Sequence, residues 1–303
     1  MNFAKTGLLT IMGIRKAVIT AAGERQRHLP LQTMVDGQGR NRKVLGLLSD
    51  EAASAGIDEI GIVVRPGTAE LYRDAVDDVS AEITFIEQLE PRGYGHAVLS
   101  AVDYVKDDPF LLMVSDHVYV SDDPNAETCA SQLVRIAEEE DCVVSTVQPT
   151  HEGRLRNFGT VGGTLFDASR DLYEVNAVLE KPTPTEAEQN LMTPGLRHGY
   201  YLTFFGMHVL QPAVMALLDE RANALGPDEQ LDLSASLHEF SRRGRYLAQV
   251  MKGRRYDLDF RHGLLIGQLA VSLSGQYRDE ILSTITDLLA RNSQRNAGNE
   301  SDI

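Results

Sequence analysis

The sequence predicts an α/β protein whose central sheet is mixed, mostly parallel and covered by helices on both faces. Short runs of apolar, often β-branched residues recur along the chain without polar alternation, as in strands that are buried on both faces. Between these runs, apolar residues repeat at helical spacing. With 303 residues and 43% hydrophobic content, the chain can form a single large domain.

The elements of the first half alternate between strand and helix. The apolar runs predict strands over residues 17–19, 59–64, 83–86, 110–114 and 142–147, and the periodic segments predict helices over 44–55, 97–105 and 133–137. In such a sheet, ligands bind beyond the carboxyl ends of the strands. The loops that follow Thr20, Val64 and Val114 are therefore the expected place for a site.

The pattern changes after about residue 150. Strands are predicted over residues 159–164, 173–179, 200–209 and 246–250, and helices over 212–220, 231–240, 263–273 and about 276–291. We expect one domain over residues 1–291, made of a first half (about 14–150), a β-rich second half (about 151–260) and C-terminal helices (261–291). The polar tail 292–303 is expected to be disordered. The last helix is amphipathic, so it packs either on its own domain or on a partner subunit of a homo-oligomer.

Charge and cysteine usage narrow the class of function. Acidic residues outnumber basic ones by 44 to 29, and the formal net charge of −15 argues against nucleic acid or a membrane surface as the main partner. The two cysteines have neither metal-site nor disulfide spacing, and no apolar run reaches the length of a membrane span. These features, with no leader pattern at the N-terminus, favour a cytoplasmic protein.

A glycine turn rich in arginine follows the first predicted strand, in the segment 16–30. Backbone N–H groups in a turn of this kind bind anions, and cationic side chains add positive charge. Five cations lie within nineteen residues of this otherwise acidic chain: Arg25, Arg27, Arg40, Arg42 and Lys43. The turn around Gly23 is therefore a candidate phosphate site, and a solvated basic loop is the alternative.

Two further segments carry candidate ligand-binding groups. The first reads Gln88-Leu-Glu-Pro-Arg-Gly-Tyr-Gly-His-Ala97 and opens a helix after a strand. Gly93 and Gly95 allow close backbone approach to a planar ligand, and Gln88 offers both a donor and an acceptor to one edge of a base. Glycines that serve only helix packing are the alternative. The second segment is a buried strand that ends at Asp116, where a carboxylate needs a cation or a donor cluster.

Together these segments resemble sugar-1-phosphate nucleotidylyltransferases over about residues 14–273, and the UTP–glucose-1-phosphate uridylyltransferase branch most of all. The family's loop, Ala-Ala-Gly-x-Gly-[Ser/Thr]-Arg-x-x-Pro, is similar to residues 21–30, with Arg25 in place of the second glycine. The segment 88–97 resembles the family's uracil-contacting Gln-x-x-x-x-Gly-x-Gly-His-Ala. Glu180-Lys-Pro182 and Asn157-Phe-Gly159 resemble the family's sugar-phosphate motifs.

The resemblance implies a Rossmann-like nucleotide-diphospho-sugar transferase fold with a small β-rich sugar-binding part. It implies that UTP and a sugar 1-phosphate, with glucose 1-phosphate first, give a UDP-sugar and pyrophosphate in the presence of Mg²⁺. The implied nucleotide-binding residues are Ala21, Ala22, Gly23, Glu24, Arg25, Gln88, Gly93 and Gly95, and the implied sugar-phosphate-binding residues are Asn157, Gly159, Glu180 and Lys181. Arg27 and Lys181 are the implied catalytic residues, and Asp116 and Asp257 the implied metal ligands, with Asp259 as an alternative to Asp257.

One departure from the family bears on activity. The family's loop continues with lysines that meet the triphosphate and the sugar phosphate, but residues 31–43 contain Thr33 at the first lysine position and lack the Pro-Lys pair. Arg25, Arg27, Arg40 or Lys43 can supply replacement charge. Without such a replacement, the sequence fits a non-catalytic homologue that binds a nucleotide or sugar nucleotide as a sensor or accessory subunit. An enzyme of the same fold with another nucleotide or acceptor is a further reading.

Overall fold

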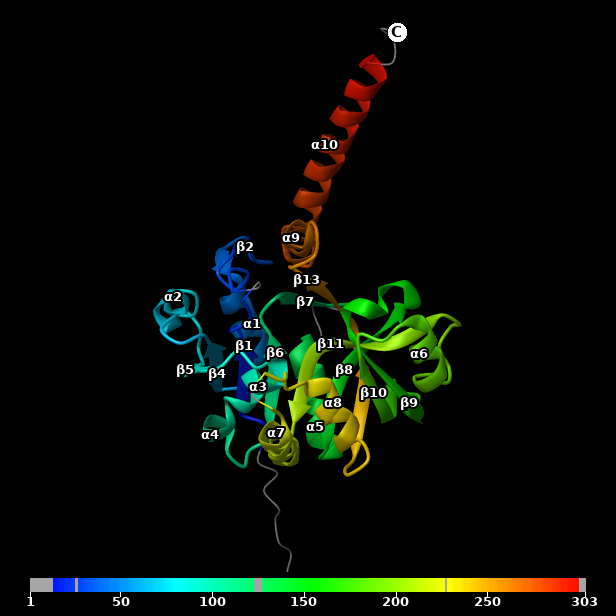
Figure 1. Cartoon of the computed structure of the whole chain (residues 1–303). Helices are drawn as coiled ribbons and strands as arrows, with labels where there is room; N and C mark the ends of the chain where they lie inside the picture. The colour runs from blue at the N-terminus through cyan, green and yellow to red at the C-terminus, as the bar shows by residue number, and fades with distance from the viewer. Residues whose placement is uncertain (1–12, 25–26, 123–126, 227, 300–303) are drawn as a thin grey trace, which may run out of the picture.

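The structure is a computed structural model of the chain, and it describes residues 13–24, 27–122, 127–226 and 228–299. Nine strands form the central sheet (Figure 1). In sheet order they are β5 (Glu82–Glu87), β4 (Glu59–Val64), β1 (Lys16–Thr20), β6 (Phe110–Val114), β11 (Tyr200–Leu210), β8 (Val143–His151), β12 (Tyr246–Val250), β10 (Leu172–Glu180) and β9 (Gly159–Asp167). Every strand predicted from the sequence lies in this sheet, so the predicted α/β fold is confirmed.

The direction of the strands reverses in the middle of the sheet. β5, β4, β1 and β6 pair in parallel, which is the arrangement expected from the continuous apolar runs of the first half. β11 then pairs antiparallel with β6 on one side and with β8 on the other. The register of β11 shifts between Phe204 and His208, around Gly206 with its φ of +97°. One long strand therefore joins the two halves of the chain.

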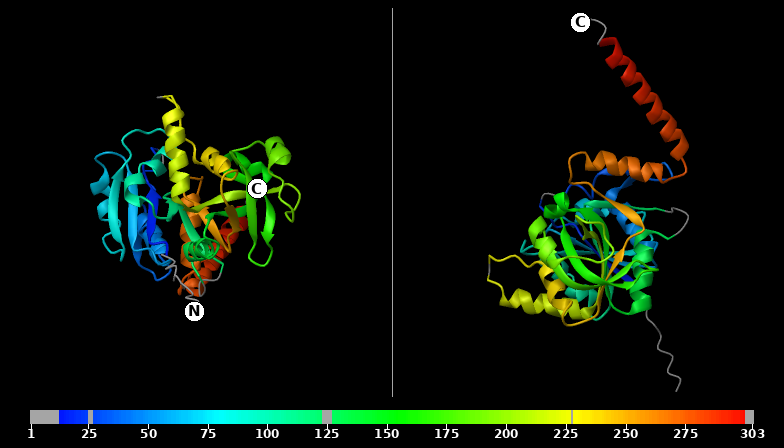
Figure 2. Two further views of the ribbon diagram at one scale, coloured as in Figure 1. Left: turned by 90° about the horizontal axis from the view of Figure 1, so that it is seen from below. Right: turned by 90° about the vertical axis from the view of Figure 1, so that its right-hand side faces the viewer.

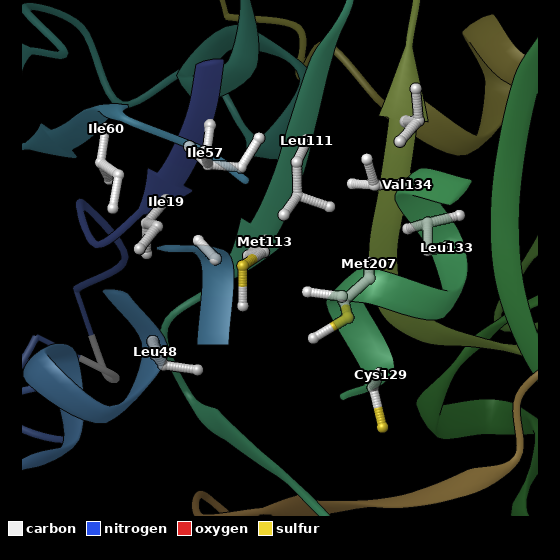
Figure 3. Packing of buried hydrophobic residues seen from close by; sticks show 14 of the residues in the cluster. Ile19, Leu48, Ile57, Ile60, Leu111, Met113, Cys129, Leu133, Val134 and Met207 are labelled. Carbon is white, nitrogen blue, oxygen red and sulfur yellow. The ribbon is translucent and has the colours of Figure 1, made fainter. Parts of the chain in front are cut away.

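Helices cover both faces of the sheet. On one face lie α1 (Val44–Ala53) and α5 (Cys129–Glu140); Figure 3 shows Leu48 and Leu133 from these helices in one cluster with Ile19, Leu111 and Met113. On the other face lie α3 (Tyr94–Leu99), α4 (Val102–Val105), α7 (Pro212–Ala224) and α8 (Leu233–Phe240). Alternate residues of the central strands point into opposite clusters, because side chains alternate across a strand.

Several short elements were not predicted from the sequence. Two further antiparallel pairs form: the hairpin of β2 (Thr33–Val35) with β3 (Asn41–Lys43), and the long-range pair of β7 (His117–Ser121) with β13 (Gly253–Asp257). The helices α2 (Ala69–Arg73) and α6 (Pro184–Asn190) and a 3-10 turn over Glu152–Asn157 are also new. The pairing of β7 with β13 matters most, because it places Asp257 opposite His117.

Two helices form the C-terminal part. α9 (Gly263–Leu273) lies over β7 and β13, and α10 (Arg278–Asn299) projects away from the body of the molecule (Figures 1 and 2). The structure describes α10 as far as Asn299, and the disorder expected for the tail 292–303 stays a prediction. Leu282, Leu288 and Leu289 of α10 are 37%, 56% and 63% exposed, whereas Ile281 and Ile285 of the same face are half-buried. A partner subunit on this face stays a prediction. Within the described ranges no helix combines the length and apolarity needed to cross a bilayer.

Candidate functional site

Two cavities open where β1, β4 and β6 end, which is the place expected from the strand order. The first cavity, of about 400 Å³, is lined by residues that include Gly23, Arg65 and Gln88. The second cavity, of about 410 Å³, lies toward β9, β10 and β13. Tyr94, Val114 and Asp116 line both cavities. The two spaces are therefore adjacent, and Asp116 lies at their junction.

The glycine turn reaches the first cavity with only part of its length. Ala22, Gly23 and Glu24 line the cavity, whereas Ala21 is buried in the hydrophobic core. Arg25 lies outside the described residues. Among the described residues, the cation that lines this cavity is Arg65, which was not named from the sequence. Arg65 could have been predicted from the sequence, because it directly follows β4 and the loop after Val64 was expected to lie at the site.

The predicted cluster of five cations is not a phosphate site as a whole. Arg40 pairs with Asp36 at 2.8 Å, and Arg42 is buried between Asp50 and Asp78 at 2.9 Å each. These two arginines therefore hold the β2–β3 hairpin in place instead of facing either cavity.

The remaining described cations of this segment are Arg27 and Lys43. Arg27 is exposed, donates from Nε to His28 Nε2 at 3.2 Å and lines neither cavity, so its predicted catalytic place is not supported. Lys43 reaches across the hairpin, and its Nζ donates to Thr33 Oγ1 at 3.0 Å. A lysine charge thus lies beside the position where the family has its first loop lysine.

The segment 88–97 contributes Gln88 and Gly93 to the first cavity but not Gly95. Gln88 is 7% exposed, lines the first cavity and donates from Nε2 to the Gly93 carbonyl at 3.3 Å. Gly93 has a φ of +95° and also lines the cavity. Gly95 does not, and a Cβ there would lie 2.8 Å from the Leu231 carbonyl oxygen. For Gly95 the packing alternative therefore holds, because the backbone of residue 231 occupies the space that a side chain would need.

A row of three ionisable side chains joins the two cavities. His117 Nδ1 lies 2.6 Å from Asp116 Oδ1, and His117 Nε2 lies 3.8 Å from Asp257 Oδ2. Burial alone would raise the pKa of Asp116, but the charge and hydrogen bond of His117 outweigh it and lower this pKa. Burial raises the pKa of Asp257, against the opposite effect of His117. Both carboxylates line the second cavity.

The geometry favours Asp257 over Asp259 as the partner of Asp116. Asp257 lies opposite His117 in the β7–β13 pair, whereas Asp259 is exposed and donates its backbone N–H to Asp257 Oδ1 at 2.9 Å. In the described part of the chain, no group of three or more His, Cys, Asp or Glu side chains is arranged to hold a metal ion. Two carboxylates at one cavity fit a Mg²⁺ ion that takes its other oxygens from water and phosphate.

All four residues predicted for sugar-phosphate binding line the second cavity. Glu180 Oε2 accepts a hydrogen bond from Ser234 Oγ at 2.7 Å, and Lys181 Nζ lies 3.5 Å from Glu180 Oε1. A Cβ on Gly159 would lie 2.5 Å from Phe204 Cδ2 and 2.9 Å from Glu180 Oε2, so a side chain there would clash with the Phe204 ring. Asn157 completes the predicted set. Lys181 has a φ of +50°, a conformation that non-glycine residues seldom adopt outside turns and sites.

Two further residues of the second cavity were missed from the sequence, Arg255 and His208. The Arg255 guanidinium lies 4.0 Å from the centre of the Phe158 ring, and burial lowers the pKa of Arg255 to about 10. Among the described residues Arg255 forms no hydrogen bond, and its buried Nη2 atom has no partner. Asp257 and Asp116 act on this charge through space, but no described carboxylate forms a close ion pair with it. A cation that lines a cavity without a direct partner is suited to an anionic ligand. His208 is buried at 3% exposure.

Comparison with known proteins identifies the family. The family model described as nucleotidyl transferase matches residues 16–244. The chain belongs to the nucleotidyl transferase family. A Streptococcus pyogenes relative named UTP–glucose-1-phosphate uridylyltransferase 2 is 26% identical, over 91% of this chain and 96% of that protein. Enzymes with the same activity name from Bacillus subtilis and Pseudomonas aeruginosa are 25% and 24% identical, over 93% and 83% of this chain and 97% and 94% of theirs.

Solved structures share the fold of this chain. A UDP-glucose pyrophosphorylase complexed with UDP-glucose has a TM-score of 0.69 and 20% identity, over 85% of this chain and 98% of that one. A UTP-bound UGPase from Acinetobacter baumannii has a TM-score of 0.70 and 20% identity, over 91% and 99% of the two chains. The predicted nucleotide-diphospho-sugar transferase fold is thereby confirmed.

Proposed function

We propose that this protein transfers the uridylyl group of UTP to glucose 1-phosphate and releases UDP-glucose and pyrophosphate. The observation that carries the proposal is the pair of cavities that meet at Asp116. The first offers Gln88 to a base and a glycine turn with Arg65 to phosphates. The second offers Glu180 to sugar hydroxyls and Lys181 to the sugar phosphate. The activity named for the curated relatives supports the same reaction.

Catalysis of this reaction mainly requires that the two anionic substrates are aligned and that their negative charge is neutralised. A phosphate oxygen of glucose 1-phosphate attacks the α-phosphorus of UTP in line with the departing pyrophosphate, so the two anions must be held together. Because each substrate has its own cavity and the cavities adjoin, binding alone aligns the attacking and leaving groups. The cations of the site stabilise the charge that develops between them.

We propose that Asp116 and Asp257 hold a Mg²⁺ ion at the junction of the cavities. When bound, the ion neutralises phosphate oxygens of both substrates. His117 contacts Asp116 at 2.6 Å and thereby orients the carboxylate, as neighbours of metal ligands commonly do.

Positive charge that lines the cavities supports turnover without the family's loop lysines. Arg65 lines the first cavity, and Arg156, Lys181 and Arg255 line the second. A guanidinium binds phosphate through a planar fork with several donors, so these arginines hold a phosphate in a defined orientation. Lys43 adds a point charge next to Thr33.

The test is release of pyrophosphate by the purified full chain. With Mg²⁺, UTP and glucose 1-phosphate we expect turnover, and with dTTP or other sugar 1-phosphates we expect lower kcat/KM. An uridylyltransferase of known activity is assayed in parallel. If the control releases pyrophosphate and this protein does not, while calorimetry detects binding of UTP or UDP-glucose, the protein is a binding homologue and the proposal is overturned.

We also infer that the protein works in the cytoplasm. Cys129 and Cys142 are both buried and form no disulfide, which suits a reducing compartment.

A further inference from the structure

Three buried side chains form a hydrogen-bonded row at the wall of the second cavity. His208 of β11, Ser145 of β8 and Tyr246 of β12 come from three neighbouring strands of the sheet. His208 Nδ1 and Ser145 Oγ are 2.6 Å apart, and Ser145 Oγ and Tyr246 Oη are also 2.6 Å apart. Of these three residues, His208 lines the second cavity, whereas Ser145 and Tyr246 do not. The row therefore begins inside the protein and ends at the ligand space.

The direction of the hydrogen bonds follows from Tyr246. Among the described residues its hydroxyl has no partner other than Ser145, and its side chain is fully buried. A buried hydroxyl proton without an acceptor costs about 1–3 kcal/mol, so Tyr246 donates to Ser145 Oγ. Ser145 then donates to His208 Nδ1, because among the described residues its own hydroxyl proton has no other acceptor. The opposite direction would leave the Tyr246 proton unpaired.

This direction fixes the proton on the imidazole ring. Burial lowers the pKa of His208 to about 3, so the ring is neutral at ordinary pH and carries one N–H proton. Because Nδ1 accepts from Ser145, that proton lies on Nε2. Within the described chain Nε2 has no hydrogen-bond partner. A donor in this position is normally satisfied by a ligand or by water.

The surroundings of His208 suit a sugar better than a phosphate. The Phe204 ring lies edge-on to the imidazole at 4.9 Å, and Phe204 and Glu180 both flank Gly159. Glu180 is a carboxylate that accepts hydrogen bonds and would repel a phosphate. The phosphate-binding charges of the cavity, Lys181 and Arg255, are cations, whereas His208 is neutral.

We propose that His208 determines sugar specificity by donating a hydrogen bond from Nε2 to a hydroxyl oxygen of the sugar 1-phosphate. Tyr246 and Ser145 are positioning residues that keep His208 in the donor form. Glu180 accepts from a sugar hydroxyl while His208 donates to one, so the pair distinguishes sugars by where their hydroxyls lie. The inference rests on the proposed function, because it requires a sugar 1-phosphate in the second cavity.

The tautomer of His208 is tested without substrate. The full chain labelled with ¹⁵N-histidine gives long-range ¹H–¹⁵N spectra, and the signals of His208 are those absent from His208→Gln. We expect a neutral ring with its proton on Nε2 at pH 7. Tyr246→Phe removes the terminal donor and should produce a mixture of tautomers. Thr203→Val, which removes a buried hydroxyl elsewhere on β11, should leave the signals unchanged. A proton on Nδ1 in the unmodified protein overturns the proposal.

The contact with sugar is tested by titration in the presence of Mg²⁺ and a UTP analogue that cannot be cleaved between its α- and β-phosphates. We expect glucose 1-phosphate to shift the His208 Nε2 signal and inorganic phosphate to leave it in place. Of the analogues that lack one hydroxyl each, one should fail to shift the signal and should bind about 10- to 100-fold more weakly. That analogue should lose nothing further in His208→Leu.

Two outcomes separate the two proposals. If glucose 1-phosphate binds and the Nε2 signal does not move, the role of His208 is overturned while the proposed function stands. If the signal moves as expected but no pyrophosphate is released, the proposed function fails and the sugar contact stands. If no sugar 1-phosphate binds at all, both fail.

Discussion

The two cavities are lined by different kinds of chain segment. The first is lined largely by short contiguous segments, in which Gly23 and Gly93 leave the backbone close to the ligand space. The second is lined by charged and polar side chains from strands far apart in sequence, such as His208 and Arg255. The first is therefore set by local conformation and the second by tertiary pairing. Variants at each cavity should affect one substrate and spare the other, and a variant at the junction should affect both.

The largest effect is expected at the junction. Asp116→Asn removes a negative charge from both cavities and should lower kcat/KM for both substrates by about a thousandfold. Pyrophosphate release at varied UTP and varied glucose 1-phosphate measures this. Asp103→Asn, at an exposed position on α4, is the control and should change neither value. An effect on only one substrate would show that Asp116 does not serve both cavities.

The next effect should be confined to the second cavity. Arg255→Met keeps the apolar contact with Phe158 but removes the unpaired guanidinium. Hydrogen bonds to charged groups are worth about 1.5–3 kcal/mol, so we expect KM for glucose 1-phosphate to rise about 10- to 100-fold with KM for UTP unchanged. Arg254→Met, at the exposed neighbouring position, should change neither. A rise in KM for UTP instead would assign Arg255 to the nucleotide.

A smaller effect should be confined to the first cavity. Gly93→Ala introduces a Cβ that would lie 2.9 Å from the Leu231 carbonyl oxygen. The backbone at residue 93, which lines the first cavity, must therefore shift. We expect KM for UTP to rise about tenfold with KM for glucose 1-phosphate unchanged. The control is Gly56→Ala, where φ is also positive, at +85°, but no atom lies within 4 Å of the added Cβ. Both variants carry backbone strain because both glycines have a positive φ, and Gly93, with a ψ of 179°, lies in a region that is essentially restricted to glycine. Only Gly93→Ala adds a clash beside the first cavity. Equal KM values for UTP in the two variants would contradict local control of this cavity.

The last prediction concerns the free energy of unfolding of the protein in acid, to which His208 of the second cavity contributes. Burial lowers the pKa of His208 from 6.5 to about 3. Between these two pH values the imidazole is protonated in the unfolded chain and neutral in the folded chain. The contribution of the neutral ring is therefore present above pH 6.5 and is lost as the pH falls toward 3. In urea unfolding, the unmodified protein should lose about 2 kcal/mol more than His208→Gln between pH 7 and pH 5. An equal loss in both proteins would mean that His208 titrates normally.

The sequence predicts the sheet well for a physical reason. Central strands such as β1, β4 and β6 are apolar runs that are buried along most of their length, so composition alone marks them. The strands of the β2–β3 and β7–β13 pairs are short and mix polar with apolar residues, and α9 packs against β2, β7 and β13. Nothing in a segment such as Gly253–Asp257 marks it as a strand by itself.

The same reasoning explains which site residues were predicted. Glu180, Lys181 and Gln88 belong to motifs in which neighbours in sequence are also neighbours at the site. Arg40 and Arg42 were overvalued, because a charge run does not show that Asp36, Asp50 and Asp78 neutralise it. His208 and Arg255 were missed, because what makes them candidates is an unpaired group in a cavity, which only tertiary structure shows.

β11 pairs with β6 of the first half and with β8 of the second, and its register shift around Gly206 lies beside the second cavity. Neither half has a complete sheet without it, because each would expose the edge of a buried strand. We therefore expect the two halves to fold as one cooperative unit and not as two modules that could be exchanged between relatives. Evolution can vary the loops of each cavity separately, but the two substrate pockets must be inherited together.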